Sequence, residues 1–448
     1  MINKMKLGDF LFLCWWGVVV LNSITDLGYL YALCWLVLVI GLLFIDYKYG
    51  LILIGSTFYL PSTPSTLTSP FLLLHILTLL AVVGSGTPRS ISMFATKKIV
   101  PFGLFLVFSV VYSVLFFDSA LAGGVGHYMS ATLFLIVCFF LFEKIQNLDQ
   151  IDFILKRVLV VAASSIAVAL IHNYLGAESN LYQKILSTGD SEQFQMKLHT
   201  TSDKSVSRLI WPGVDPNFFA SNLFVVLALS LYYSHKNRAF LLVAALIGMS
   251  VIGSYSRSAF ITMVLMSFLL FLKGDNKKLV MVLVAALSVL AGIFAVDYVE
   301  RILSISDNLA NSGGSGRFER IGYGVAVVAD NILGVGIGNV SQALWTGVMS
   351  EGWTTHNTYL QVLVESGILL FLLFICSLYH LLSTGCVIKS EPLIAYMKVG
   401  LLATLFFYVT IPVMDWRFFI FYVFIYVYAF RLSEEQPPVM VGPTINKV

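Results

Sequence analysis

The sequence predicts an all-α polytopic membrane protein, and three observations lead to this fold class. Hydrophobic residues fill 58% of the 448 positions, and charged residues fill only 11%. The mean hydropathy is +0.88, far above the average of soluble domains. Apolar runs long enough to cross a bilayer recur along the whole chain. Helices are the expected spanning elements because they satisfy their backbone polar groups internally.

The apolar runs between polar breaks predict about fourteen transmembrane helices. The segment 50–61 is short enough to be a half-helix or a re-entrant piece. No internal repeat is visible, so the inverted-repeat pattern of many transporters is missing. The expected spans are 9–24, 27–45, 50–61, 70–86, 99–117, 128–143, 157–175, 216–234, 239–254, 258–273, 279–297, 357–384, 393–412 and 417–431.

Basic residues orient these spans. With both termini in the cytoplasm, 18 of the 27 Lys and Arg residues fall on the cytoplasmic side, as the positive-inside rule expects. Two larger loops then face the periplasm. The expected parts are N-terminal helices (1–175), a periplasmic loop (176–215), further helices (216–297), a large periplasmic loop with the catalytic motifs (298–356), C-terminal helices (357–431) and a cytoplasmic tail (432–448).

Several classes of function are disfavoured by composition. A net charge of +3 is too small to indicate a nucleic-acid partner. The five cysteines lie in or beside apolar runs, which indicates neither a disulfide framework nor a metal site. The first apolar run is followed by no small-residue cleavage site and is interpreted as an uncleaved span. We expect no cofactor and no metal.

Arginine and lysine are sorted differently between the two sides. The cytoplasmic side holds 14 of the 17 lysines, whereas the outer side holds six of the ten arginines. Lysine suffices for topology, so outer arginines favour bidentate binding of a phosphate or carboxylate. The alternative is that these side chains contact lipid headgroups at the interface. The six are Arg208, Arg257, Arg301, Arg317, Arg320 and Arg417.

Two short motifs on the outer side precede apolar spans. RLIWPGVDPNFFAS (208–221) contains Asp-Pro-Asn, in which Pro216 fits the first helical turn and Asp215 fits the N-cap. SYSRSAF (254–260) is a tight turn with Arg257 at its tip. Such a hairpin needs no arginine, so Arg257 is a candidate for a function at the membrane surface.

A glycine-rich stretch carries two more arginines. SGGSGRFERIGYGVAVVADNILGVGIGN (312–339) contains Arg317 and Arg320 and ends in a Gly-x-Gly-x-Gly pattern. No strand–turn–helix context surrounds the pattern, so a dinucleotide site is not indicated. Glycines here favour a turn or a close backbone approach. The segment 318–333 is expected to form a short helix at the membrane interface.

The motif TTHNTYLQVLVESG (354–367) opens a long apolar span. Thr354 or Thr355 fits the N-cap, which places His356 and Asn357 in the first turn, where backbone N–H groups and the helix dipole favour an anion. Arginines nearby are expected to keep the imidazole neutral and able to act as a general base. Glu365 is half a turn out of phase with His356 and is not its obvious partner.

Taken in order, these motifs resemble the O-antigen ligase/polymerase superfamily over roughly residues 205–370. The resemblance rests on Asp-Pro-Asn, Ser-Arg-Ser, Gly-Arg before Gly-x-Gly, and His-Asn-x-Tyr-Leu before Glu-x-Gly. It implies a metal-independent glycosyltransferase that uses a glycan on undecaprenyl pyrophosphate. It further implies His356 as the base and Arg257 and Arg317 as diphosphate ligands. Candidates for substrate binding are Arg208, Arg320, Asp215, Asn217, Asn357 and Tyr359.

The number of spans favours a polymerase, which acts on lipid-linked donor and acceptor in the inner membrane during lipopolysaccharide or other polysaccharide biosynthesis. A ligase that transfers the glycan to lipid A-core is the alternative. A polysaccharide or lipid transporter is the alternative from another class, but it calls for more ionisable residues at mid-membrane depth. A chain-length regulator is a further candidate partner. The site is expected to face the periplasm.

Overall fold

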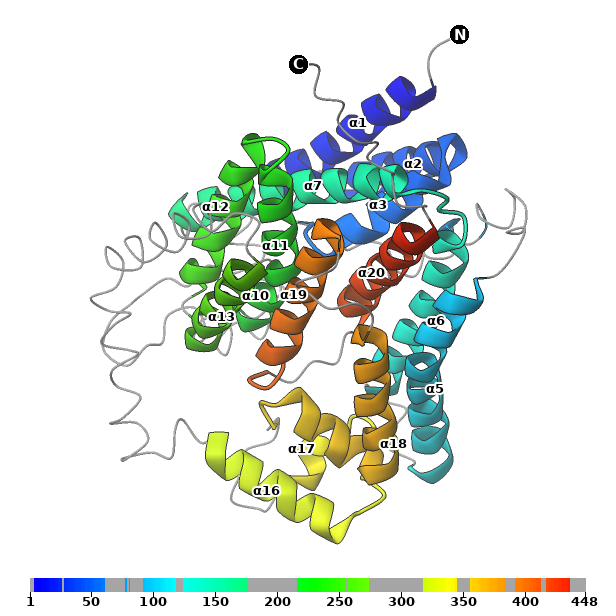
Figure 1. The fold of residues 1–448 in the computed structure, drawn as a ribbon, viewed down its shortest axis with the longest axis vertical. Coiled ribbons are helices and arrows are strands. Elements are labelled where there is room, and N and C mark those ends of the chain that lie inside the picture. The colour runs from blue at the N-terminus through cyan, green and yellow to red at the C-terminus, as the bar shows by residue number, and fades with distance from the viewer. Residues whose placement is uncertain are drawn as a thin grey trace, which may run out of the picture.

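The computed structural model describes residues 4–25, 28–60, 77–78, 80, 92–117, 124–175, 216–254, 256–273, 317–344, 355–383, 391–411 and 416–435. Within these ranges the secondary structure is helical, without a strand, so the predicted all-α fold class is confirmed (Figure 1). The helices are α1 (Lys4–Thr25), α2 (Gly28–Ile45), α3 (Tyr47–Thr57), α5 (Met93–Phe116), α6 (Gly124–Phe142), α7 (Leu148–Leu175), α10 (Pro216–Ser221), α11 (Leu223–Ser234), α12 (Ala239–Gly253), α13 (Arg257–Lys273), α16 (Arg317–Asp330), α17 (Val340–Ala343), α18 (Thr358–Leu382), α19 (Pro392–Phe407) and α20 (Arg417–Glu435).

Five helical stretches are long and apolar enough to cross a membrane: Met93–Phe116, Gly124–Phe142, Leu148–Ile171, Asn217–Ser234 and Thr358–Leu382. Shorter apolar helices also occur in α1, α2, α12, α13 and α19. Each predicted span contains a described helix except 279–297, which lies outside the described residues, and 70–86, which lies almost entirely outside them. The 11-residue α3 is about 16 Å long, too short to cross alone, as expected for a half-helix.

Helices approach closely where a glycine faces a neighbour. A Cβ on Gly400 of α19 would lie 2.8 Å from the Cα of Val225 in α11, and one on Gly55 of α3 would lie 2.5 Å from the Phe421 ring. Small residues provide such contacts in membrane proteins, where lipid removes most of the hydrophobic driving force between helices. Between α5, α18 and α20, aromatic rings such as Phe105, Phe374 and Trp416 fill the core.

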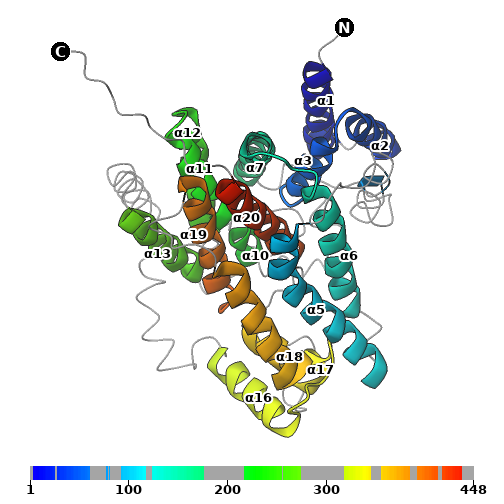
Figure 2. The same ribbon diagram turned by 45° about the vertical axis from the view of Figure 1, so that its right-hand side comes forward.

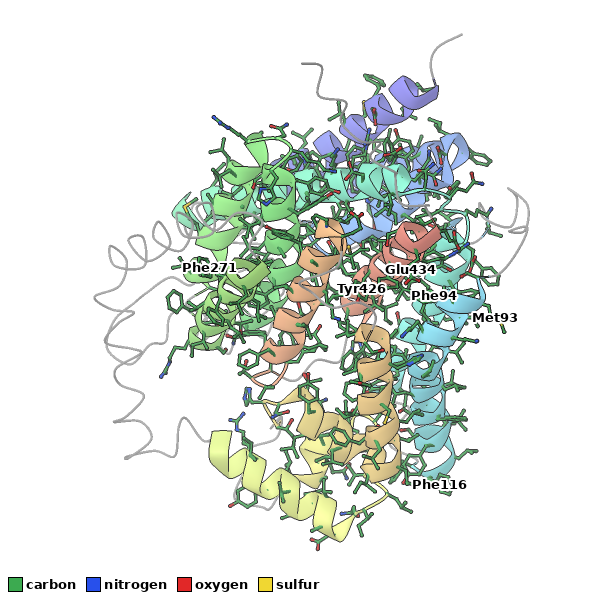
Figure 3. All side chains as sticks on the ribbon, in the orientation of Figure 1. Met93, Phe94, Phe116, Phe271, Tyr426 and Glu434 are labelled. Carbon is green, nitrogen blue, oxygen red and sulfur yellow. The ribbon has the colours of Figure 1, made fainter. Side chains whose placement is uncertain are left out.

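Hydrogen bonds between helices define two opposite ends of the bundle. Tyr359 at the start of α18 donates to the Leu405 carbonyl at the end of α19, so these two helices are antiparallel. Lys98 near the start of α5 donates to the His380 carbonyl near the end of α18. Figure 3 shows α5 running from Met93 to Phe116, which lies at the same end as α16. We call these ends the His356 end and the Lys98 end.

The turn between α12 and α13 belongs to the His356 end. His235, just after α11, lies 2.9 Å (Nε2 to Oη) from Tyr396 near the start of α19. The end of α11 and the start of α12 are therefore at the Lys98 end, and the next turn, 254–256, is at the opposite end.

The amphipathic helix α16 packs across the start of α18 (Figures 1 and 2). Ile321, Val327 and Val328 cover a small apolar cluster that includes Leu360 and Val364. The expected interfacial helix in 318–333 is thus present as Arg317–Asp330. Its position at the end of the bundle, across the start of a spanning helix, agrees with an interfacial location.

Candidate functional site

The N-terminus of α18 is capped by Asn357, which corrects the expected register. The Asn357 side-chain oxygen accepts a hydrogen bond from the Leu360 N–H at 3.0 Å, and the helix begins at Thr358. We expected a threonine cap with Asn357 in the first turn. Asparagine is the stronger N-cap residue, because its short side chain reaches the free N–H groups of the first turn well. His356 therefore precedes the helix and does not belong to it.

His356 has a left-handed backbone conformation. Its φ of 49° makes it the one non-glycine residue with positive φ in the described part of the chain. The turn around it is held by Thr355, whose hydroxyl donates to the Asn357 carbonyl at 2.8 Å. A non-glycine residue in this region is strained, and such strain persists where the surroundings enforce it, often at functional sites. The side chain is half-buried.

The start of α18 is attached to the end of α19 by three hydrogen bonds. The Thr358 N–H donates to the Tyr408 carbonyl at 2.9 Å, and the Thr358 hydroxyl donates to the Ile411 carbonyl. The Tyr359 hydroxyl donates to the Leu405 carbonyl at 2.8 Å. Tyr359, a candidate for substrate binding, thus has an anchoring contact in this structure. The turn that carries His356 is thus held by Thr355 before it and by the contacts of Thr358 and Tyr359 after it.

Helix α18 is broken at Gly367, whose φ of 72° and ψ of 176° are not helical. A break inside a span exposes backbone groups that lipid cannot satisfy. The segment 331–339, which we call the glycine loop, supplies their partners. The Val364 and Glu365 carbonyls accept from the N–H groups of Val335 and Gly336, both at 2.9 Å, and the Ile368 N–H donates to the Ile332 carbonyl at 3.0 Å.

The glycines at the break permit contact between two backbones. A Cβ on Gly367 would collide with the Leu333 carbonyl carbon, and one on Gly334 would lie 2.5 Å from the Gly367 nitrogen. Gly334, Gly336 and Gly338 all have φ between 84° and 91°. The interpretation of this pattern as a turn with a close approach is confirmed. The N–H groups of residues 334–339 donate to protein acceptors, so this part of the glycine loop is not a phosphate cradle.

Glu365 has its own set of neutral partners beside this loop. Its Oε1 accepts from Gln361 Nε2 at 3.0 Å and from the Gly338 N–H at 3.2 Å. Its Oε2 accepts from the Tyr128 hydroxyl at 3.5 Å. The residue is 1% exposed. The sequence indicated only that Glu365 is not the partner of His356. The glycine in the span and the Gly-x-Gly-x-Gly pattern were the available signals for this contact.

Arg257 is the first residue of α13, in the turn at the His356 end. Ser256 caps this helix by accepting from the Ala259 N–H at 3.3 Å. Arg257 is half-buried, and within the described residues its guanidinium forms no hydrogen bond or ion pair. A fixed backbone with an unoccupied guanidinium is a suitable geometry for binding an anion.

Arg317 and Arg320 lie at the start of α16, three residues apart and therefore on one side of the helix. Their side continues into Gly324 and Val327, which face α18: a Cβ on Gly324 would lie 2.8 Å from Leu360. Arg320 is half-buried, and burial lowers the pKa of its guanidinium, which still remains charged at neutral pH. For Arg317 the backbone position alone is described.

The remaining candidates are placed only in part. Asn217 is half-buried in α10, which contacts α13 at the His356 end. Arg208 and Asp215 lie outside the described residues. Pro216 begins α10, as expected for a proline in the first helical turn. The described candidates thus share one end of the bundle.

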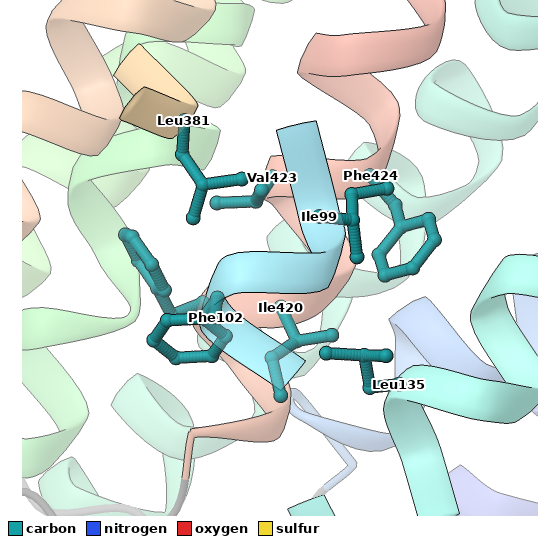
Figure 4. A pocket seen from close by; sticks show the side chains of 8 residues that line it. Ile99, Phe102, Leu135, Leu381, Ile420, Val423 and Phe424 are labelled. Carbon is teal, nitrogen blue, oxygen red and sulfur yellow. The ribbon is translucent and has the colours of Figure 1, made fainter. Parts of the chain in front are cut away.

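A small pocket elsewhere does not have the chemistry of this site. It lies between α5, α6, α18 and α20 and is lined by Ile99, Phe102, Leu135, Leu381, Phe419, Ile420, Val423 and Phe424 (Figure 4). Every lining side chain is apolar, so this pocket offers no ligand for a sugar or a phosphate. Groups of His, Cys, Asp or Glu that could hold a metal ion are absent from the described residues.

Comparison with known families supports the resemblance found in the motifs. The O-antigen ligase family matches residues 223–375. This range contains Arg257, Arg317, Arg320, His356 and Tyr359 and excludes the Asp-Pro-Asn motif. The match supports the O-antigen ligase/polymerase superfamily, whose members transfer glycans. Neither the curated proteins nor the solved structures gave a match.

Proposed function

We propose that this protein is an inner-membrane glycosyltransferase that polymerises oligosaccharide repeat units carried on undecaprenyl pyrophosphate. One observation carries the proposal: His356, Arg257 and the arginine-bearing helix α16 lie at the same end of the bundle. The hydrogen bonds that place them involve residues far apart in sequence. The family match adds glycan transfer as the class of reaction.

In the proposed step, a sugar hydroxyl of the acceptor attacks the anomeric carbon of the donor glycan. A new glycosidic bond forms as the bond between that carbon and the diphosphate oxygen breaks. The His356 imidazole accepts the hydroxyl proton, and undecaprenyl pyrophosphate leaves with the bonding electron pair. In-line attack inverts the anomeric centre.

The leaving diphosphate gains negative charge as the bond breaks. Arg257, Arg317 and Arg320 are our candidates to stabilise this charge, and Arg208 is a further one. A guanidinium suits the task because it stays charged and donates two parallel hydrogen bonds to a phosphate. Asn217, Asn357 and Tyr359 remain candidates for contacts with the sugars.

The test is polymerisation in proteoliposomes that contain the purified protein and lipid-linked repeat units as the sole glycan substrate. A ladder of longer glycans with release of undecaprenyl pyrophosphate is expected. If glycan moves only after lipid A-core is added, the protein is a ligase. Entry of lipid-linked units into the vesicle lumen without any new glycosidic bond would instead indicate a transporter.

We further propose that the His356 end faces the periplasm. The support is the concentration of lysines at the opposite end, which the positive-inside rule assigns to the cytoplasm. An Asn331→Cys variant should react with an impermeant thiol reagent added to intact cells, whereas Asn237→Cys should not. Both positions are exposed, one at each end. The reverse pattern would overturn the orientation.

A further inference from the structure

We propose that Glu365 is a positioning residue that holds an arginine-bearing arm on the broken helix α18. The arm consists of residues 317–339, that is, α16 and the glycine loop. The inference rests on the proposed function, because it gives the arm the task of presenting Arg317 and Arg320 to the diphosphate.

The Glu365 carboxylate joins three separate elements. It accepts hydrogen bonds from Gln361 in its own helix, from Tyr128 in α6 and from the Gly338 N–H in the glycine loop. Among the described residues no lysine, arginine or histidine forms an ion pair with it. The carboxylate therefore accepts hydrogen bonds that connect parts of the protein. Burying a charge at this depth is costly, so these contacts are the reason we assign to it.

Other hydrogen bonds between described residues also attach the arm to the bundle. Three backbone hydrogen bonds connect it to α18 around Gly367, and the Ile337 N–H donates to the Ser113 hydroxyl in α5 at 2.9 Å. Beyond the loop, α16 also makes apolar contacts with α18, such as Gly324 against Leu360. Glu365 is the one charged group in this set. Its loss should increase the fraction of molecules with a detached arm.

A detached arm lowers donor affinity in a defined way. If only molecules with a docked arm bind the diphosphate well, the apparent affinity for the donor equals the intrinsic affinity multiplied by the docked fraction. A saturating concentration of donor then shifts the population back to molecules with a docked arm. Weakening the attachment therefore raises the KM for the donor and the Kd for the carrier diphosphate, while kcat stays near its original value. A residue that reacts directly would change kcat.

The first experiment compares Glu365→Gln with the unaltered protein. Binding of undecaprenyl pyrophosphate to the purified protein in detergent is measured, followed by KM and kcat with lipid-linked repeat units. We expect Kd and KM to rise by about tenfold and kcat to be maintained. Ser377→Ala is the matched control. It also removes a buried polar group from α18, but its hydroxyl bonds only within its own helix, so neither constant should change.

The second experiment reattaches the arm by a disulfide. Ile332 and Ile368 share a backbone hydrogen bond and are both exposed, so Ile332→Cys and Ile368→Cys should be close enough to pair. In a background without the native cysteines, the disulfide should return Kd of the Glu365→Gln variant to the original value. Reductant should remove this rescue. The disulfide should also form more slowly in the Glu365→Gln variant than in the same background with Glu365 intact, a result that needs no substrate.

The outcomes separate this inference from the proposed function. Unchanged Kd and unchanged disulfide formation in Glu365→Gln would overturn the positioning role, as would a fall in kcat alone. Weaker binding that the disulfide fails to restore would also contradict it. If the unaltered protein binds no undecaprenyl pyrophosphate, the proposed function fails instead, and the rate of disulfide formation still tests the attachment of the arm.

Discussion

The two ends of the bundle differ in the partners of their basic side chains. At the Lys98 end several basic side chains form ion pairs, including Arg157 with Asp9, Lys236 with Asp152 and Arg431 with Glu143. At the His356 end, Arg257 forms no ion pair with a described residue. Described lysines, in contrast, lie at or toward the Lys98 end. The expected sorting of arginine and lysine is thus present in the fold.

Basic residues therefore have different roles at the two ends. At the Lys98 end carboxylates lie beside the basic groups, so these charges contribute to structure and orientation. At the His356 end Arg257 lacks such a partner among described residues and can pair with an external anion. Substitutions at the His356 end should therefore change turnover, and substitutions at the Lys98 end should change stability.

The largest effect is expected at His356. His356→Gln should lower turnover by about 10²–10⁴-fold, because an amide cannot accept the proton, while donor binding persists. His356→Gly is the control for backbone strain. Glycine adopts a φ of 49° without steric cost, so this variant should fold well and remain inactive. Turnover is measured in proteoliposomes and binding with undecaprenyl pyrophosphate. Near-normal elongation by His356→Gln would assign the base to another residue.

A smaller loss is expected at Arg257. Arg257→Lys keeps the charge but loses the planar pair of donors, so kcat/KM should fall by about 10–100-fold. Arg238→Lys is the matched change in the exposed turn at the opposite end and should be silent. Both variants should accumulate to normal levels. Equal activity of Arg257→Lys and Arg238→Lys would contradict a functional difference between the two ends.

Gly367→Ala tests the contact between α18 and the glycine loop. An alanine there is strained at φ 72° and meets the Leu333 backbone, so the loop must move. We expect the unfolding free energy to fall by about 1–3 kcal/mol and the donor KM to rise. Gly322→Ala in α16 is the control, because its Cβ meets open space. It should preserve or raise stability. Equal behaviour of the two would contradict the close approach.

The smallest effect on turnover is expected from Arg431→Ala at the Lys98 end. It leaves the Glu143 carboxylate, whose side chain is 1% exposed, without its cation. Unfolding free energy should fall by about 1–3 kcal/mol, while kcat per folded molecule is unchanged. Lys48→Ala, which breaks a more exposed pair with Asp46, should cost less than about 1 kcal/mol. A selective loss of kcat in Arg431→Ala would place this end in the reaction.

The lengths of the apolar runs predicted most of the fold because a bilayer requires a minimum length of every span. The sequence also indicated α16 and the glycine turn. It did not reveal the break at Gly367, because a lone glycine in an apolar run is compatible with an intact helix. The cap was misplaced because Thr355 and Asn357 both have capping side chains, and our prediction assigned the cap to a threonine.

The candidate site was predictable as a set of residue types but not as a set of contacts. His356, Arg257 and the α16 arginines stand out as polar groups beside apolar spans. Their common end depends on pairs such as Tyr359 with Leu405, which are 46 residues apart. Two partners of Glu365 come from α6 and the glycine loop, and although the glycines indicated a close approach, one sequence does not say which residues meet. The roles of the site residues remain predictions.

The break at Gly367 also affects the height of the hydrophobic surface. Beyond it, the regular part of α18 is 368–382, about 22 Å long. The apolar helices α12, α13 and α19 have 15, 17 and 16 residues, or about 22–26 Å, whereas α5 has 24 residues, about 36 Å. A hydrocarbon layer of about 30 Å exceeds the shorter group. The bilayer should therefore thin beside α12 and α13, whose apolar side chains are partly exposed, and this brings lipid headgroups closer to Arg257 and His356. Activity that peaks in bilayers of short acyl chains would reveal this mismatch.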